Sequence, residues 1–353
     1  MNKRLGFIFL IISLLATIVL IAYIFFSLEK PVSTVTKETE SEVKTVTITA
    51  VGDCTFATDI GFSGGTSFDK EYENQNKDHT YFLRNVLPLF EKDDLTIVNF
   101  EGTLSERGTR AEKEYSFRGN PEYVKILTSS SVEAANLANN HTRDYGEEAL
   151  FDTQQILEEN GVLWFGRNHS VLKYANGAMV GLIGTPAYNS SGMSAFLKEL
   201  KELKSYNPDI IIASFHWGEE LSTTPNEIQK QLAHTAIDNG VDLVIGHHPH
   251  ILQGIEKYKG KYIVYSLGNF CFGGHKNPSD KDTILFRQTF SFKNGQLLDT
   301  DNAEVIPCSI SSVNDRNNYQ PTPLSDEDFE RVRKKLIERS SGFSGIECIK
   351  FTE

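Results

Sequence analysis

Five short apolar segments of this chain are each followed at once by polar residues of the kinds that bind metal ions. The apolar segments have the composition of buried β-strands and span residues 46–51, 95–98, 132–137, 210–213 and 243–245. The polar residues that follow them are Asp53; Asn99 and Glu101; Asn139, Asn140 and His141; His216; and His247, His248 and His250. Because functional groups of α/β proteins gather at the carboxyl ends of strands, we expect these clusters to meet at one rim.

Helical patterns alternate with these strands along the chain. We expect helices over residues 81–90, 146–160, 227–239 and 326–339, further strands at 178–183 and 262–265, and a long loop over 61–80. Strands that alternate with helices predict βα units and a sheet covered by helices. The sequence therefore predicts an α/β fold.

The residue types in the five clusters suit metal chemistry. Carboxylate, amide oxygen and imidazole are ligands that Mn, Fe or Zn accept, and several such groups in one small volume are unfavourable unless they are paired or bind a metal. Taken singly, most clusters have a structural explanation: a turn for Asp53, a helix cap for Asn99 and Glu101, and core packing for His141 and His216. Residues 246–250 are different, because three histidines within four residues are hard to explain by packing.

The N-terminus carries the signal for location. Lys3 and Arg4 precede an uncharged apolar run over residues 5–26, which as a helix would be about 33 Å long, enough to cross a bilayer. Positive charge before the run keeps residues 1–4 in the cytoplasm and predicts that everything after it is exported. Residues 27–43 then form a solvated stalk. The alternative, a cleaved signal peptide, would have a shorter apolar core and a small-residue cleavage site.

Charge and cysteine content set further limits. The formal net charge is −12, which argues against a nucleic-acid partner, since phosphate contacts need clustered lysines and arginines. Exported cysteines can pair, and the sequence leaves open whether Cys308 and Cys348 form a disulfide.

Six motifs together carry a family resemblance. They are Val51-Gly52-Asp53, Asn99-Phe100-Glu101, Ala138-Asn139-Asn140-His141 with Asp144-Tyr145-Gly146, His216-Trp217-Gly218 with Glu220, Gly246-His247-His248-Pro249-His250, and Tyr265-Ser266-Leu267-Gly268-Asn269-Phe270. In this order, over residues 46–290, the chain resembles the poly-γ-glutamate capsule synthesis protein CapA family, which is similar in turn to calcineurin-like metallophosphoesterases. We assign the matching domain to residues 44–310 and a C-terminal extension with a surface helix to 311–353.

The resemblance implies a four-layer α/β/β/α sandwich, which would follow the N-terminal transmembrane helix predicted over residues 5–26. It also implies roles at the site. Asp53 and His250 would bind a first metal, Glu101 or less favourably Asn99 would bridge, Asn140, His216 and His248 would bind a second metal, and His141 would be the acid that protonates a leaving oxygen. Asn139, Glu220, His247 and Asn269 would contact these ligands or the substrate.

This chain departs from the phosphoesterase pattern at three places. Thr55 stands where the pattern has a histidine, Asn99 and Glu101 stand in place of aspartates, and Thr58 stands where CapA-like chains often carry an arginine. The first two changes weaken the first-metal site and the case for two-metal phosphoester hydrolysis. The third removes a clamp for an anionic substrate group.

The family resemblance implies an extracytoplasmic, membrane-anchored component of poly-γ-glutamate capsule synthesis and export. Its partners would be the membrane-embedded and ATP-using subunits of a polymer synthase complex, and the polymer itself. The chain has no glycine-rich phosphate loop ending in Lys-Ser or Lys-Thr, so it is not the ATP-dependent ligase. The metal site would either hydrolyse a bond or bind polymer carboxylates through cations. An alternative is a metal-dependent phosphoesterase or polymer hydrolase at the cell surface.

Overall fold

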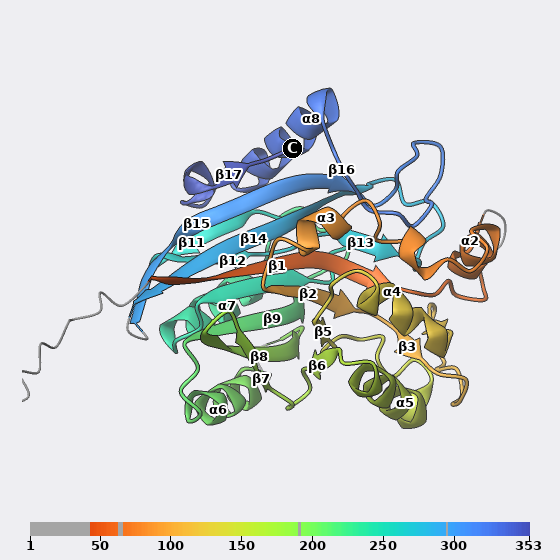
Figure 1. The fold of residues 1–353 in the computed structure, drawn as a ribbon, viewed down its shortest axis with the longest axis horizontal. Coiled ribbons are helices and arrows are strands. Elements are labelled where there is room, and N and C mark those ends of the chain that lie inside the picture. The colour runs from red at the N-terminus through yellow and green to blue at the C-terminus, as the bar shows by residue number, and fades with distance from the viewer. Residues whose placement is uncertain (1–42, 63–65, 190–191, 294–295) are drawn as a thin grey trace, which may run out of the picture. The chain divides into compact units, whose positions relative to one another are not determined.

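The computed structural model describes residues 43–353 except 63–65, 190–191 and 294–295, and the described residues form one compact unit (Figure 1). The predicted cytoplasmic residues 1–4, the anchor over 5–26 and the stalk up to residue 42 lie outside the described residues. Within the part of the chain that is described, no helix is long and apolar enough to cross a membrane.

A nine-stranded sheet carries the first half of the predicted site. Its strand order is β16-β15-β14-β1-β2-β5-β6, with β13 paired to β1 and β17 paired to β15. The strands are β1 (Lys44–Thr55), β2 (Leu95–Phe100), β5 (Ala134–Asn136), β6 (Leu163–Phe165), β13 (Asn269–Phe272), β14 (Asp282–Lys293), β15 (Gln296–Ser309), β16 (Thr322–Pro323) and β17 (Lys350–Phe351). Strands β13, β1, β2, β5 and β6 pair in parallel, so their carboxyl ends lie at one edge.

A six-stranded sheet carries the second half, in the order β11-β12-β10-β9-β8-β7. Its strands are β7 (Val171–Ala175), β8 (Ala178–Ala187), β9 (Ile210–Trp217), β10 (Leu243–His247), β11 (Ile255–Tyr258) and β12 (Lys261–Val264). Strands β8, β9, β10 and β12 pair in parallel. A small third sheet joins β3 (Thr103–Leu104) to β4 (Arg118–Gly119).

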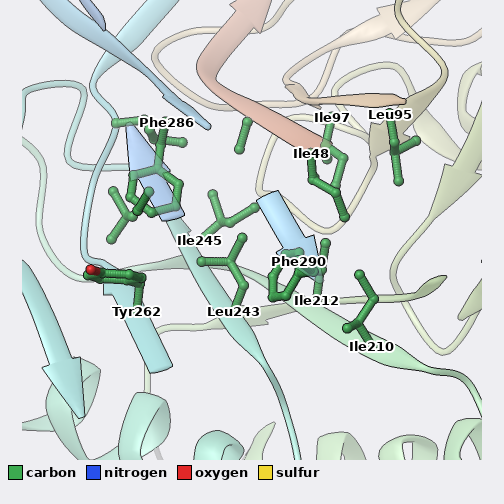
Figure 2. Close-up of a cluster of buried hydrophobic side chains, with 14 of the residues drawn as sticks. Ile48, Leu95, Ile97, Ile210, Ile212, Leu243, Ile245, Tyr262, Phe286 and Phe290 are labelled. Atoms are coloured by element: carbon green, nitrogen blue, oxygen red, sulfur yellow. The ribbon is translucent and has the colours of Figure 1, made fainter. Parts of the chain in front are cut away.

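The two large sheets pack face to face. Alternate residues of each strand point to opposite faces, and Ile97 of β2, Ile212 of β9 and Ile245 of β10 lie in one shared buried cluster between the sheets (Figure 2). Their sequence neighbours point outward into two other clusters. The interior is therefore a sheet-on-sheet core with a separate apolar layer outside each sheet.

Helices supply those outer layers. The cluster outside the nine-stranded sheet includes residues of α2 (Phe68–Asn74), α3 (Leu87–Phe90), α4 (Val124–Thr128) and α5 (Gly146–Glu159). The cluster outside the six-stranded sheet includes residues of α6 (Gly192–Lys204) and α7 (Glu227–Asp238). The prediction of a mixed α/β fold is confirmed, with helices on the outer faces of two stacked sheets (Figure 1).

The C-terminal segment is part of the same compact unit. Helix α8 (Asp326–Arg339) has the predicted bounds, and its Val332 and Leu336 are buried in the core cluster between the sheets. Strands β16 and β17 both add to β15. Residues 311–353 thus complete the nine-stranded sheet and are more than a surface addition.

Two local predictions were wrong. The helix expected over 81–90 is a 3-10 turn (His79–Tyr81) followed by the short helix α3. Pro88 lacks a backbone N–H, so it fits in the first turn of α3 but not in the interior of a helix that begins at residue 81. The loop expected over 61–80 contains α2, which begins where the Ser67 side chain accepts a hydrogen bond from the Lys70 backbone N–H. All four cysteines are unpaired, including Cys308 and Cys348.

Candidate metal centre

The strand register aligns the predicted site residues across both sheets. In the nine-stranded sheet, Asp53 lies opposite Asn99 on one side and Asn269 on the other. In the six-stranded sheet, His216 lies opposite His247. His247 Nδ1 lies 3.2 Å from Asp53 Oδ1, and Asn99 Nδ2 lies 3.4 Å from His216 Nδ1, so the prediction that polar residues after separate strands meet at one place is confirmed for β1, β2, β9 and β10.

Asp53 is a fully buried carboxylate held by three side chains. Asn99 Nδ2 donates to its Oδ1 at 2.8 Å, His247 Nδ1 lies 3.2 Å from Oδ1, and His250 Nδ1 lies 3.1 Å from Oδ2. Burial alone would raise the pKa of Asp53, but the adjacent imidazoles of His247 and His250 hold it well below its usual value. Asp53 is therefore an ionised carboxylate in the interior.

Glu101 lies close to the imidazoles of both sheets. It is fully buried, and neither carboxylate oxygen finds a hydrogen-bond partner among the residues that the structure describes. The Nε2 atoms of His141, His216 and His250 lie 3.6, 3.7 and 3.9 Å from its Oε1, too far for hydrogen bonds. Two ligands that each lie about 2.1 Å from a tetrahedral ion are about 3.4 Å apart, so this spacing resembles that of atoms sharing a cation.

The electrostatics of Glu101 also fit a cation at this position. Burial, and then the negative charge of Asp53, raise the pKa of Glu101 well above its ordinary value. Burial alone would lower the pKa of His250, but the nearby Glu101 and Asp53 carboxyl groups raise it to about 10. Two buried carboxyl groups close together are unfavourable without a cation, and a divalent ion would supply one.

Two groups of ligand atoms within 4.8 Å of one another could hold a metal ion. One is Asp53, Glu101 and His250, and the other is Glu220, His248 and His250. His250 belongs to both, so the groups are adjacent. The first group has the three residues predicted for the first metal and the bridging position. The donor set and the unpartnered oxygens of Glu101 fit a divalent metal such as Mn, Fe or Zn.

The residues predicted for a second metal also lie together. Asn140 Oδ1 is 2.8 Å from His216 Nε2, and the rings of His216 and His248 have centroids 4.7 Å apart. Burial, followed by the charge of His250, lowers the pKa of His248 to about 4. Burial also lowers the pKa of His216 well below its usual value. Both imidazoles are therefore neutral, which is the form that binds a metal.

His141 is oriented by an acidic partner. Its Nδ1 lies 2.7 Å from Asp144 Oδ2, and Lys113 Nζ forms an ion pair of 2.5 Å with the other oxygen of Asp144. Burial lowers the pKa of His141 in spite of Asp144. With Nδ1 engaged by Asp144, the Nε2 atom of His141 faces Glu101.

An amide network ties the site to the strands. Asn139 Nδ2 donates to the Phe100 carbonyl oxygen at 2.8 Å, and Asn139 Oδ1 accepts from the His141 backbone N–H at 3.0 Å. Asn269 Oδ1 lies 2.9 Å from His250 Nδ1. Each amide therefore holds a neighbouring loop or imidazole, in keeping with a supporting role for Asn139 and Asn269.

The histidine loop is held in an uncommon backbone conformation. His248 and His250 have φ values of 96° and 60°, in the left-handed region that non-glycine residues seldom adopt. Gly246 packs so tightly that a Cβ atom there would lie 2.0 Å from the Tyr265 carbonyl oxygen. Strained residues persist only where their surroundings enforce them, and here the strain aims two imidazoles into the site.

Three residues of the site, Asn136, Lys113 and Tyr188, were missed by the sequence analysis, and Asp144 was part of a motif but was given no role. Asn136 Nδ2 donates to Asn99 Oδ1 at 3.0 Å, and the Tyr188 ring lies 5.1 Å from that of His248. Lys113 and Asp144 support His141. The contact of Asp144 could have been predicted, because an acid three residues after a histidine can hydrogen-bond to it. Lys113 and Tyr188 reach the site only through the tertiary fold.

Comparisons with known proteins match the region that holds this site. Residues 47–274 match the family model described as bacterial capsule synthesis protein PGA_cap. The PGA biosynthesis protein CapA of Bacillus subtilis (strain 168) is 32% identical over 315 residues, which are 82% of this chain and 79% of that protein. The capsule biosynthesis protein CapA of Bacillus anthracis is 29% identical over 290 residues, 74% of this chain and 68% of that protein.

Among solved structures, the NAD nucleotidase of Haemophilus influenzae aligns with 88% of this chain and 57% of its own chain, with a TM-score of 0.43 and 11% identity. That likeness is too weak to bear on function.

Proposed function

Because this chain belongs to the bacterial capsule synthesis protein PGA_cap family, that of the CapA proteins, we propose that it is a membrane-anchored, extracytoplasmic component of poly-γ-glutamate capsule synthesis and export. The names of the two Bacillus relatives support the link to that polymer. The apolar run over residues 5–26 after Lys3 and Arg4 supports the anchor and the orientation.

We further propose that the rim site binds one or two divalent ions, Mn, Fe or Zn. Asp53, Glu101 and His250 would hold one ion, and Asn140, His216 and His248, with Glu220 within reach of His248 and His250, would hold the other. The observation that carries this proposal is Glu101, a buried carboxyl group that faces three imidazoles and has no hydrogen bond from the described residues. When bound, such ions supply positive charge for polymer carboxylates or polarise a bond for hydrolysis.

We also propose that the fold is the four-layer α/β/β/α sandwich of the metallophosphoesterase type. The two stacked sheets, the outer helices and the rim site at the strand ends support a sandwich of the metallophosphoesterase type. Thr55 and Asn99 still differ from that pattern, which favours polymer handling over phosphoester hydrolysis.

The proposed partners are the membrane-embedded and ATP-using subunits of a synthase complex. An exported domain cannot reach cytoplasmic ATP, and the sequence contains no glycine-rich loop ending in Lys-Ser or Lys-Thr. The energy-requiring polymerisation therefore belongs to other subunits, and this chain would act on the polymer as it emerges.

One substitution tests the proposal in cells. His248→Ala removes an imidazole from the site and should abolish capsule while the protein remains abundant in the membrane fraction. His234→Ala is the matched control, because His234 bonds Glu256 at 2.9 Å within the described fold and is outside the site. Normal capsule from the His248→Ala strain would contradict the proposal.

The alternative function is a metal-dependent phosphoesterase or polymer hydrolase at the cell surface. The orientation of His141 by Asp144 favours it, because an imidazole with Nδ1 held by a carboxylate presents Nε2 to receive or donate a proton. Hydrolysis of bis-p-nitrophenyl phosphate with added Mn²⁺, lost in His141→Ala, would support this alternative. Capsule loss in His248→Ala with no hydrolysis by the wild type would favour the binding role.

A further inference from the structure

A pocket of about 510 Å³ opens beside the metal centre. One end is lined by His141, Glu220, His250 and Asn269, and the rest is lined largely by aromatic and small polar side chains. The volume lies in the range of roughly 300–1,000 Å³ that is usual for small-molecule sites. A ligand in this pocket would therefore lie directly against the proposed metal site.

Aromatic rings form one wall of the pocket. The rings of Phe62 and Tyr115 are stacked with centroids 5.2 Å apart and planes 6° apart, and His275 meets Phe62 edge-on at 5.6 Å. Phe272 lies deeper, with its ring 5.1 Å from that of His250. Tyr115 keeps 41% of its surface exposed, so its ring is available to a ligand.

The charges of the pocket away from the metal centre are already compensated. Asp280 accepts from Lys335 Nζ at 3.1 Å and lies 3.8 Å from Arg339 Nη2. Arg339 also donates to the Leu252 carbonyl oxygen. Arg339 is the one lysine or arginine in the lining, so the described pocket offers no free cation along its aromatic wall.

A polyanion is therefore a poor occupant of the aromatic part of the pocket. Its carboxylates would lie beside Asp280 without an uncommitted positive charge, in a protein of net charge −12. A neutral ligand with one apolar face and several hydroxyl or amide groups fits better. Aromatic rings attract polarised C–H groups through their negative faces, and Thr223, Asn269 and Ser279 offer hydrogen-bonding groups nearby.

We infer that this pocket binds a neutral sugar unit of a glycan, with one ring face against Tyr115 and its hydroxyl or acetamido groups toward Thr223, Asn269 and Ser279. The inference rests on the proposed function, because it places a cell-surface glycan next to the metal centre that we propose acts on the polymer.

A binding titration of the full-length chain in detergent micelles tests the inference. The probe is the tetramer of N-acetylglucosamine, measured by calorimetry after metal is stripped with a chelator and the chelator is removed. The wild type should bind the probe saturably, Tyr115→Ala should weaken binding at least tenfold, and Tyr115→Phe should retain it because the ring stays. The control is Tyr174→Ala on β7, which changes another exposed tyrosine and should bind as the wild type does.

Three outcomes would overturn the inference. They are no binding by a folded wild-type chain, equal binding by Tyr115→Ala and wild type, and Tyr115-dependent binding of a γ-linked glutamate tetramer in place of the sugar probe. Metal uptake by the same preparation is measured separately. Sugar binding that fails with metal uptake intact refutes the glycan site alone, whereas failed metal uptake with intact sugar binding refutes the metal centre alone.

Discussion

The molecule contains two clusters of buried ionisable side chains that differ in how their charges are balanced. At α8, the buried Asp282 pairs with Arg331 at 2.5 Å and also with Lys335. At the rim of the sheets, Glu101 is fully buried and has no hydrogen bond from any described residue. The Asp282 carboxylate is paired directly with two cationic side chains, whereas the Glu101 carboxyl group has only imidazoles 3.6 to 3.9 Å from its Oε1.

Their pKa shifts follow this difference. Burial would raise the pKa of Asp282, but hydrogen bonds and charge from Arg331 and Lys335 lower it. Burial and the charge of Asp53 raise the pKa of Glu101. A buried charge without a partner is unfavourable by roughly several kcal/mol, so a directly paired cluster indicates a structural role and an unpaired carboxyl group is a candidate for binding a cation. The comparison therefore separates a stabilising cluster from the proposed binding site.

The largest expected effect comes from the residue that both metal-ligand groups share. His250→Ala should lower metal affinity at least about 100-fold, because it removes a direct ligand from each group. Competition with a chromogenic chelator measures the affinity. His234→Ala should leave it unchanged, and unchanged affinity in His250→Ala would place the metal elsewhere.

The paired cluster should respond in folding stability and not in metal content. Asp282→Ala leaves Arg331 and Lys335 without their buried partner, and we expect unfolding free energy to fall by about 2 kcal/mol. Denaturant titration measures the loss, and elemental analysis should find the wild-type metal content. Loss of metal in this variant would remove the distinction between the clusters.

Glu101→Gln should raise the unfolding free energy of the metal-free protein, whereas Asp282→Ala should lower it. A carboxyl group with a raised pKa makes the folded state less stable as pH rises above the unfolded-state value of about 4.5, so the amide should stabilise the stripped chain at pH 8 by about 1 kcal/mol. At pH 4 the two chains should be nearly equal. A destabilised Glu101→Gln chain at pH 8 would show that Glu101 has an internal partner.

The smallest effect should come from Arg331→Ala. Arg331 is half exposed, and Lys335 remains to pair with Asp282, so the loss should be less than about 1 kcal/mol. The same denaturant titration measures it, with Lys334→Ala as the control on the same helix. A loss as large as that of Asp282→Ala would mean that Arg331 alone balances the cluster.

Much of the site was predictable because local signals mark strand ends. Apolar runs located β1, β2, β9 and β10, and the residues that close these strands are the ones that the fold brings together. The antiparallel hairpin of β14 and β15 was not predicted. The pairing of residues 311–353 with β15 was not predicted either, because it depends on contacts far apart in sequence.

The side chains that hold the predicted ligands in place were harder to predict than the ligands themselves. Lys113 reaches Asp144 from 31 positions away, and no local pattern gives that contact. Helix α2 was hidden because its buried Phe68 and Tyr72 lie among polar residues typical of loops. The local sequence pattern therefore predicts which residues at the strand ends form the site, and tertiary packing determines which other side chains contact them.

The metal content of the purified full-length chain tests the central claim most directly. Elemental mass spectrometry after dialysis against Mn²⁺, Fe²⁺ or Zn²⁺ should find one or two equivalents of bound metal, lost in His250→Ala. A folded wild-type chain that takes up none of the three metals would contradict the account and leave the rim as a metal-free surface for polymer or partner proteins.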